Sequence, residues 1–476
     1  MKQFKNLILL ALVAFVTSCG EDFLSPDPLS AISSDVYYSD EEELTVALAA
    51  MYDGIQGVNQ LAITTNGLNH GIQREYQLTE MRSDNTRTKS FEGEPAEFEN
   101  YSVSTSNGVV FDYYRSYYDV IFRANTVLAN LGVVSAANLP AFEGEAKFVR
   151  AYAYFNLVRL FGDVPLVLEP IGISDRETQF TRVATSTIYT QIISDFNAAI
   201  DGLDNTYKGR ASRAAAQGLL AKVHLTLGNY PDAQILCEAI INGGEFDLEE
   251  TFVDLFYTEL NDEIIFAIEF LEDDNNDSQD FSAEWLNAVG RSSGLNYVTA
   301  DARAALDALG GNRTEYSYRQ DALQTTQFQV VKYLPNGDED LGIPATSPAP
   351  RLGGNDWIVL RYADVLLMHV EAILAGGEET TASTAIASFQ AVRDRAGLTD
   401  VVTSITKQEL LDERRVELAF ENQRLFDLIR FGEAQNVLSA HSDANGYTFS
   451  ATDLLLPIPQ AERNLSDGLL EQNPGY

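Results

Sequence analysis

The stretch RAAAQGLLAKVHLTLGNYPDA, residues 213–233, decides the fold of this chain. Its alanine and glycine side chains are small enough to let two helices approach each other closely, and Gly228 permits a tight turn between them. Tyr230 and Ala233 then open a returning helix. We therefore predict a helical hairpin made of residues 210–228 and 231–242.

The same helical periodicity recurs along most of the chain. Apolar residues follow the i, i+3, i+4, i+7 spacing of a helix face in the segments 43–58, 111–132, 143–161, 186–203, 210–228, 231–242, 361–375, 381–396 and 406–431. The hairpin has the small residues and turn of a tetratricopeptide unit. We predict a mainly α fold: a tetratricopeptide-type helical repeat scaffold of about four helix pairs, near 43–132, 143–203, 210–242 and 361–396.

Three long stretches, 60–110, 244–300 and 310–357, lack strong helical periodicity. Ordering such segments costs conformational entropy, and each needs hydrogen-bond partners for its backbone. Long irregular segments inside a compact domain usually carry function. We therefore predict that these three stretches form the candidate binding surface.

The N-terminus predicts export. Lys2 and Lys5 precede an apolar stretch, 7–16, that is too short to span a bilayer, as in a cleaved signal peptide. The next residues, Val-Thr-Ser-Cys at 16–19, resemble the lipobox of bacterial lipoproteins, so Cys19 is the predicted lipidated N-terminus.

The domain organisation follows from this start. Residues 1–18 are the predicted lipoprotein signal peptide, and 19–30, which contain Pro26 and Pro28, are a predicted lipid-anchored tether. Residues 31–476 are predicted to form a single domain.

The net charge is −38, from 70 acidic and 32 basic residues. A field of this sign repels nucleic-acid phosphates, so we expect no nucleic-acid partner. Its simplest explanation is a solvated acidic surface. With Cys19 acylated, Cys237 is the one remaining cysteine, and its apolar helical setting predicts a small buried side chain.

The sequence offers little for catalysis. Residues 290–294 fit G-x-S-x-G around Ser292, but a nucleophile elbow needs a strand before it, and 284–289 looks helical. His369 lies within a helical pattern that explains it as packing. No zinc, Walker or dinucleotide motif occurs. We predict no catalytic residues and no cofactor.

One acidic loop resembles a calcium site. Asp273, Asn275, Asp277 and Glu284 occupy positions 1, 3, 5 and 12 of an EF-hand loop, but Ser278 stands where that loop needs glycine. A solvated surface loop has the same composition. We predict no metal site, although a calcium ion near 273–284 stays open as an alternative.

Aromatic and polar residues gather in the irregular segments. Sugar rings have apolar C–H faces and a rim of hydroxyls, so a glycan site combines aromatic platforms with carboxylate, amide and guanidinium groups. The predicted ligand-binding residues are Tyr76, Arg82, Asp84, Asn85, Phe91, Trp285, Asn287 and Tyr297. The alternative is that these aromatic residues fill small cores beneath long loops.

A local basic excess lies in the same region, at Arg74, Arg82, Arg87 and Lys89. It could bind a uronate or sulfate group of an acidic sugar. Alternatively, these side chains pair with glutamates between 75 and 94.

Blocks from both ends of the chain carry a family resemblance. After Cys19 come Phe23, Leu24 and Pro26, and further blocks follow in family order: RAN (123–125), EAKFVRAYAYF (145–155), FGDVPL (161–166), NDEIIF (261–266), LRYADVLL (360–367), VRDRAGL (392–398), ERRVELAFE (413–421), RLFDLIR (424–430), LPIP (456–459) and QNPGY (472–476). Together they resemble the SusD/RagB family of outer-membrane glycan-binding lipoproteins.

The resemblance implies four tetratricopeptide-type helix pairs that cradle an irregular ligand-binding half. It implies a lipid-anchored protein, exposed on the cell surface at the outer membrane, that captures oligosaccharide or polysaccharide as a lid on a SusC-like TonB-dependent transporter. Such proteins are not enzymes. The competing expectation is a peptide-binding lid of a RagA/RagB-like importer. We read the charges of 413–430 as a structural ion-pair network.

Overall fold

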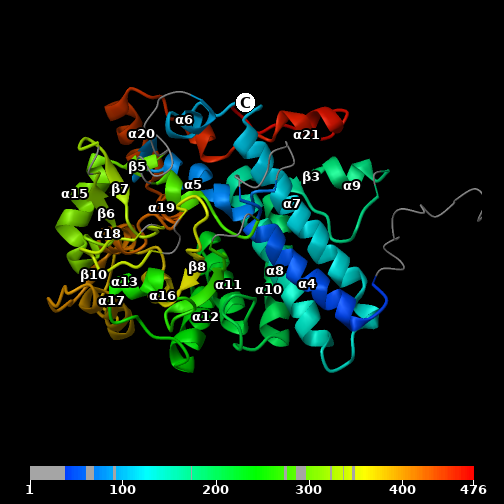
Figure 1. Cartoon of the computed structure of the whole chain (residues 1–476), viewed down its shortest axis with the longest axis horizontal. Coiled ribbons are helices and arrows are strands. Elements are labelled where there is room, and N and C mark those ends of the chain that lie inside the picture. Colours follow the sequence, from blue (N-terminus) through cyan, green and yellow to red (C-terminus); the bar gives the residue numbers. More distant parts are fainter. Residues whose placement is uncertain are drawn as a thin grey trace, which may run out of the picture.

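The computed structural model describes residues 38–59, 69–88, 93–172, 174–272, 276–285, 296–321, 324–335, 337–345 and 349–476. Helices dominate these residues (Figure 1). The fold class is therefore the predicted one: mainly α, with tetratricopeptide-like helical repeats. Among the described residues, none of the helices is both long and apolar enough to cross a membrane.

The helices follow one another along the whole described chain. Their bounds are α4 Glu41–Gln56, α5 Glu75–Leu78, α6 Glu94–Glu99, α7 Gly108–Ala129, α8 Leu139–Phe161, α9 Arg176–Phe180, α10 Thr185–Gly202, α11 Arg213–Thr226, α12 Tyr230–Gly243, α13 Phe252–Tyr257, α14 Phe281–Glu284, α15 Ala300–Leu309, α16 Tyr362–Leu374, α17 Ser383–Arg395, α18 Lys407–Glu417, α19 Arg424–Arg430, α20 Ala434–Asn445 and α21 Gln460–Leu465.

The strands are short and pair in antiparallel twos. The pairs are β1 Thr86–Thr88 with β5 Asn296–Val298, β2 Val164–Pro165 with β3 Arg182–Val183, β4 Ile264–Ile268 with β8 Trp357–Arg361, β6 Tyr318–Gln320 with β7 Phe328–Val330, and β9 Glu379–Thr380 with β10 Ile405–Thr406. In the middle of the molecule, β8 runs directly into α16.

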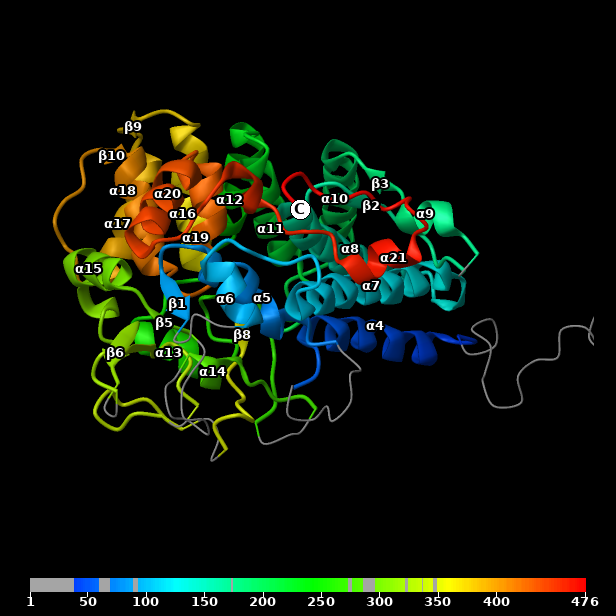
Figure 2. The same ribbon diagram turned by 90° about the horizontal axis from the view of Figure 1, so that it is seen from above.

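The long helices pack in neighbouring pairs: α4 against α7, α8 against α10, α11 against α12, and α16 against α17. Figure 2 shows α4 and α7 along one side and α16 to α20 at the opposite end. Helix α8 is buried almost all round because α7 and α10 cover it from different sides. The largest apolar cluster joins α4, α7, α8, α10, α11 and β4, and a second lies among α16 to α20.

The hairpin of 213–233 forms as its residues dictate. Gly228 has φ +73° at the turn between α11 and α12, in the left-handed region that glycine adopts most easily. A Cβ on Gly218 would lie 2.3 Å from the Leu360 side chain of β8 and 3.5 Å from Ile240 of α12. The small residues therefore let α11 pack against the central strand as well as against its own partner helix.

The prediction of one helix over 406–431 is wrong, because the segment breaks into α18 and α19. Phe420 and Asn422 have φ values of 66° and 59°, which a right-handed helix cannot contain. In this conformation Glu421 binds Arg361 and Lys332, and the backbone N–H of Asn422 donates to the Glu80 side chain at 2.9 Å. Because the helix breaks here, the Glu421 side chain and the Asn422 backbone N–H can bind buried partners that they could not contact from a continuous helix.

The predicted structural role of the 413–430 charges is confirmed. Glu417 accepts hydrogen bonds from Arg313, Arg361 and Arg395, and all four side chains are buried or nearly so. Arg414 donates to Asp364 and Asp427 at 2.9 Å each. These pairs join α16, α17, α18 and α19 to β8 and to Arg313 in the segment that precedes β6.

Candidate functional site

Two predicted platform aromatics, Tyr76 and Trp285, lie in the interior. Their ring centroids are 5.6 Å apart, and the Trp285 ring also meets Tyr333 and Phe420 edge to face. Tyr76 is 2% exposed and Trp285 is 1% exposed. In this arrangement neither ring offers a face to a sugar, so the alternative of a small core beneath long loops describes them better.

The predicted polar residues Arg82, Asp84 and Asn85 bind other parts of the chain. Arg82 donates to the carbonyl oxygens of Leu78 and Asp453. Asn85 accepts from Arg415 at 3.0 Å. All three are buried, so they join the segment 78–85 to the C-terminal helices.

The Asp84 carboxylate is held by two guanidinium groups. Arg424 binds both of its oxygens, at 2.8 and 2.9 Å, and Arg415 reaches it at 2.9 Å. Burial alone would raise the pKa of Asp84, but Arg415 and Arg424 outweigh it and hold the pKa below its usual range. Asp84 is therefore a fixed anion whose charge is already compensated.

The remaining predicted residues have mixed outcomes. Tyr297 is half-buried on β5, and the Arg87 guanidinium lies 5.1 Å from the centroid of its ring. Several residues named in the sequence analysis lie outside the described residues, namely Cys19, Lys89, Phe91, Asp273, Asn275, Asn287 and Ser292 with its G-x-S-x-G neighbours.

Two members of the basic excess at 74–89 lie in the interior. Arg74 and Arg82 are buried, which removes them from contact with a ligand at the surface. Burial lowers the pKa of Arg82. Burial acts in the same direction on Arg74, but Asp280, Tyr76 and other acidic neighbours raise its pKa above the ordinary value.

A buried polar cluster surrounds Arg74. The carboxylates of Asp280 and Glu284 face Arg351, with N–O distances of 3.8 and 3.9 Å. In the described chain, the indole nitrogen of Trp285 and the Nε2 atom of His70 are buried without a hydrogen-bond partner. Unpaired buried polar groups are costly and commonly bind ordered water or a ligand. Among the described residues, this cluster keeps unused hydrogen-bonding capacity close to Tyr76 and Trp285.

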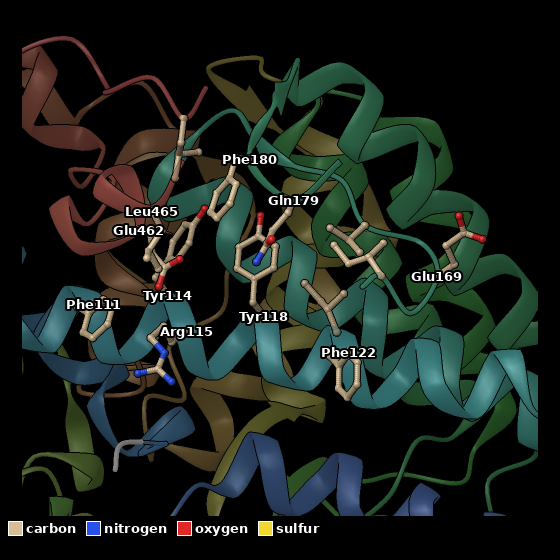
Figure 3. Close-up of a pocket in the computed structure, with 14 residues that line it drawn as sticks. Phe111, Tyr114, Arg115, Tyr118, Phe122, Glu169, Gln179, Phe180, Glu462 and Leu465 are labelled. Carbon is tan, nitrogen blue, oxygen red and sulfur yellow. The ribbon is translucent and has the colours of Figure 1, made fainter. Parts of the chain in front are cut away.

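A well-defined groove lies elsewhere, between α7, α9 and α21 (Figure 3). It has a volume of about 460 Å³, which is within the usual range for small-molecule sites. The side chains of Phe111, Tyr114, Tyr118 and Phe122 follow one another along α7, and Phe180 of α9 faces them. This groove therefore combines an aromatic floor with access from solvent.

Polar groups line the same groove. Arg115 of α7, Glu169 of the loop after β2, Gln179 of α9 and Glu462 of α21 supply a guanidinium, an amide and two carboxylates. Burial raises the pKa of Glu462, and the charge of Arg115 opposes that shift. Together with the aromatic side chains, these groups form the mixture expected of a glycan site, but none of the predicted ligand-binding residues contributes to it.

Another hollow, of about 590 Å³, contains two residues from the predicted region, Asp84 and Arg87. Asp301, Asp412, Arg415 and Arg424 complete its charged lining, and His441 lies beside them. Burial lowers the pKa of His441, so its imidazole is mainly neutral at pH 7. Few aromatic faces line this hollow, which makes it a weaker sugar site than the groove on α7.

Asp273 and Asn275 of the calcium alternative, and Ser292 of the catalytic one, lie outside the described residues. In the part of the chain that the structure describes, no group of histidine, cysteine and acidic residues could hold a metal ion. His369 is buried on α16 with its Nδ1 atom 2.8 Å from the Ser388 hydroxyl, which confirms the packing explanation. Cys237 is a buried free thiol, as predicted.

Sequence reasoning missed the groove because its walls are short. The pattern of 111–132 predicts a helix. Phe111, Tyr118 and Phe122 lie on one side of it, because they are seven and then four residues apart. Helices α9 and α21 are five and six residues long, too short for a periodic pattern. The groove forms because α9 and α21, which are distant from α7 in the sequence, lie beside it in the fold.

Comparison with known proteins identifies the family. A family model described as "SusD family" matches residues 310–476, and one described as "Starch-binding associating with outer membrane" matches residues 29–225. SusD-like protein P2 of Formosa agariphila is 25% identical over the full length of both chains.

Solved structures agree. The chain resembles a laminarin-binding SusD-like protein with a TM-score of 0.75 and 25% identity, over 92% of this chain and all of that one. It also resembles surface glycan-binding protein A of Bacteroides thetaiotaomicron in complex with laminarihexaose, with a TM-score of 0.72 and 21% identity, over 91% of this chain and 99% of that one.

The two family models match opposite ends of the chain, and the relative from Formosa agariphila spans all of it. Proteins of this family bind carbohydrate, are not enzymes, and associate with the outer membrane. The expectation of a non-catalytic binding protein is thereby confirmed at the level of the family. The chain belongs to the SusD-like family.

Proposed function

We propose that this chain is a cell-surface glycan-binding lipoprotein, anchored through lipidated Cys19. It captures an oligosaccharide or polysaccharide and delivers it to a SusC-like TonB-dependent transporter for import. The observation that carries the proposal is the similarity, at 25% identity over 92% of the chain, to a laminarin-binding SusD-like protein.

The described geometry supports a binding role. The α7 groove supplies aromatic faces with guanidinium, amide and carboxylate groups. The cluster around Arg74 keeps unpaired polar atoms near Tyr76 and Trp285, two of the predicted ligand residues. The ligand roles predicted for 76–91 and 285–297 remain proposals, and they require a sugar to reach side chains that the described arrangement buries.

The glycan proposal is tested by isothermal titration calorimetry of the mature protein. Laminarin, starch, xyloglucan and alginate, with their oligomers, form the panel. At least one polymer should bind with modest affinity, because sugar hydroxyls exchange water for protein partners at little net gain. Absence of binding across the panel would contradict the proposal.

The second candidate is a peptide-binding lid of a RagA/RagB-like importer, because the same helical scaffold could hold an extended backbone. A defined tryptic digest of casein in the same calorimeter distinguishes the two. Binding of peptides without binding of any polysaccharide would favour this alternative. Genes for glycoside hydrolases or lyases beside the coding sequence would favour the glycan reading, and genes for peptidases would oppose it.

Delivery to a transporter predicts a stable complex. The packed helix pairs offer a rigid surface on which a barrel can dock. Purification of the tagged protein from mildly solubilised outer membrane should recover a large β-barrel protein. Recovery of the lipoprotein alone, even after chemical crosslinking, would count against delivery by this route.

The lipid anchor is tested separately. Cys19→Ala should abolish incorporation of a labelled fatty acid and release the protein from the membrane fraction. Unchanged labelling of that variant would refute Cys19 as the anchor without affecting the glycan proposal.

A further inference from the structure

The groove between α7, α9 and α21 leaves part of its apolar lining uncovered: Phe111 and Tyr118 are half-buried, whereas Tyr114 and Phe180 are buried. Phe122 is 52% exposed and Leu465 is 60% exposed, at opposite walls of the groove. In a chain with a net charge of −38, large apolar side chains grouped at one hollow indicate a contact surface.

The aromatic rings lie in a row. Helix α7 rises 1.5 Å per residue, which places Tyr118 about 10 Å from Phe111 and Phe122 about 6 Å further along the axis. Figure 3 shows these side chains succeeding one another along the helix. An extended chain of sugar rings laid along α7 would meet one aromatic side chain after another, as stacking requires.

The polar groups are suited to hydroxyls. Arg115 and Gln179 can donate hydrogen bonds, while Glu169 and Glu462 can accept them. The Tyr118 hydroxyl donates to the Pro165 carbonyl at 2.8 Å and is also hydrogen-bonded to the Tyr114 side chain, which fixes its ring. Both kinds of partner that a sugar hydroxyl needs are therefore present around the aromatic row.

The walls are held in place before any ligand binds. Arg176 of α9 donates to the Leu465 carbonyl of α21 and pairs with Asp467 at 2.8 Å. Arg182 of β3 donates to the Glu471 carbonyl and to Asn473 in the C-terminal tail. Such links reduce the cost of ordering the site on binding.

Charge and backbone geometry select the ligand class. The charged groups of the lining are Arg115 against Glu169 and Glu462, so the groove is slightly acidic within a strongly acidic protein. A uronate or sulfate would be repelled. The floor is a helix whose backbone groups bond within α7, so an extended peptide could not add to it as a strand.

We propose that this groove is a binding site for a neutral glycan chain, stacked on Tyr118 and Phe122 and held by Arg115 and Gln179. The proposal deepens the glycan function above and rests on it. It places a site on the helical scaffold, apart from the irregular segments in which the sequence predicted ligand contacts.

The test measures affinity for laminarin, a neutral glucan, and for alginate, a polyuronate. The proteins are the wild type, Phe122→Ala, Arg115→Gln and the control Tyr207→Ala, whose side chain is 64% exposed and does not line the groove. Thermal melts establish that all four fold. Loss of one stacked ring should weaken laminarin binding about 3- to 10-fold, and Tyr207→Ala should leave it unchanged.

The outcomes separate the two proposals. If the wild type binds neither polymer nor any other glycan of the panel, the proposed function fails and this inference fails with it. If laminarin binds with equal affinity to the wild type, Phe122→Ala and Arg115→Gln, the function stands and the groove assignment is overturned. If Phe122→Ala retains laminarin but loses the co-purifying barrel, the groove contacts the transporter instead. Tighter, salt-sensitive binding of alginate that Arg115→Gln abolishes would overturn the neutral class.

Discussion

Replacing Glu417 by glutamine should destabilise the fold strongly, because this carboxylate is shared by three arginines. It accepts from Arg313 at 2.7 Å and from Arg361 at 2.6 Å, and it also binds Arg395. Glu417 is 0% exposed. The variant keeps the side-chain volume and leaves buried guanidinium groups without their shared counter-charge.

The expected loss is about 3–5 kcal/mol at pH 7, the cost of breaking a buried ion pair from one side. The matched control is Glu143→Gln, which removes an exposed carboxylate that pairs with Lys147 within one helix. Exposed pairs of this kind contribute about 0.5 kcal/mol or less. Urea unfolding of the three proteins, followed by circular dichroism, measures both differences.

The pH dependence gives a second, independent check. Burial would raise the pKa of Glu417, but Arg395, Arg361 and Arg313 outweigh it and hold the pKa well below 4.5. A carboxyl whose pKa is depressed by folding contributes stability above its unfolded pKa and loses it as the pH falls. The gap between the wild type and Glu417→Gln should therefore narrow below about pH 4.5. Equal stability at pH 7, or a gap that widens in acid, would refute the reasoning.

Three further changes test other parts of the fold. Burial raises the pKa of Glu80 from 4.5 to about 7, so the stability that protonated Glu80 contributes is complete below pH 4.5 and is lost as the pH rises through 7. Relative to Glu80→Gln, the wild type should lose about 3 kcal/mol of unfolding free energy between pH 4.5 and 8.5 in denaturant titrations. The same pH dependence of unfolding free energy in both proteins would contradict this. Gly57 has φ +69°, and a Cβ there would lie 2.2 Å from the His70 carbonyl carbon. Gly57→Ala should therefore lower the free energy of unfolding in urea by more than about 1 kcal/mol. The control Gly132→Ala should be nearly neutral, because a Cβ on Gly132 would have no atom within 4 Å. Burial raises the pKa of the Cys237 thiol, so Ellman's reagent should label it only when the protein unfolds; rapid labelling in buffer would show that the thiol is accessible.

The sequence predicted most of the helical scaffold because long helices leave a repeated apolar pattern. Residues 143–161 were expected to be helical, and α8 spans Leu139–Phe161. The pattern failed at Phe420 and Asn422, where apolar spacing continues while the backbone turns into the left-handed region. That break is driven by buried partners such as Arg361, which lie far away in the sequence.

The site was harder to predict because residue type does not determine exposure. Tyr76 and Trp285 have the chemistry of sugar platforms, but Tyr333 and Phe420 enclose the Trp285 ring. Arg82 has the chemistry of an anion-binding group, but backbone carbonyls of Leu78 and Asp453 take its hydrogen bonds. Tyr333, Phe420 and Asp453 belong to distant segments of the chain, so the composition near Trp285 and Arg82 cannot reveal these contacts.

The C-terminal tail shows how closely scaffold and candidate site are connected. Asn473 donates to the carbonyl oxygens of Phe161, at the end of α8, and Leu456, at 2.8 and 2.7 Å. Arg182 binds the same asparagine from β3. These bonds fix the tail on α8 and β3, and α21 therefore lies beside α7 as one wall of the groove. The QNPGY ending that pointed to the family thus has a structural role, because it positions the wall of the groove that carries Glu462 and Leu465.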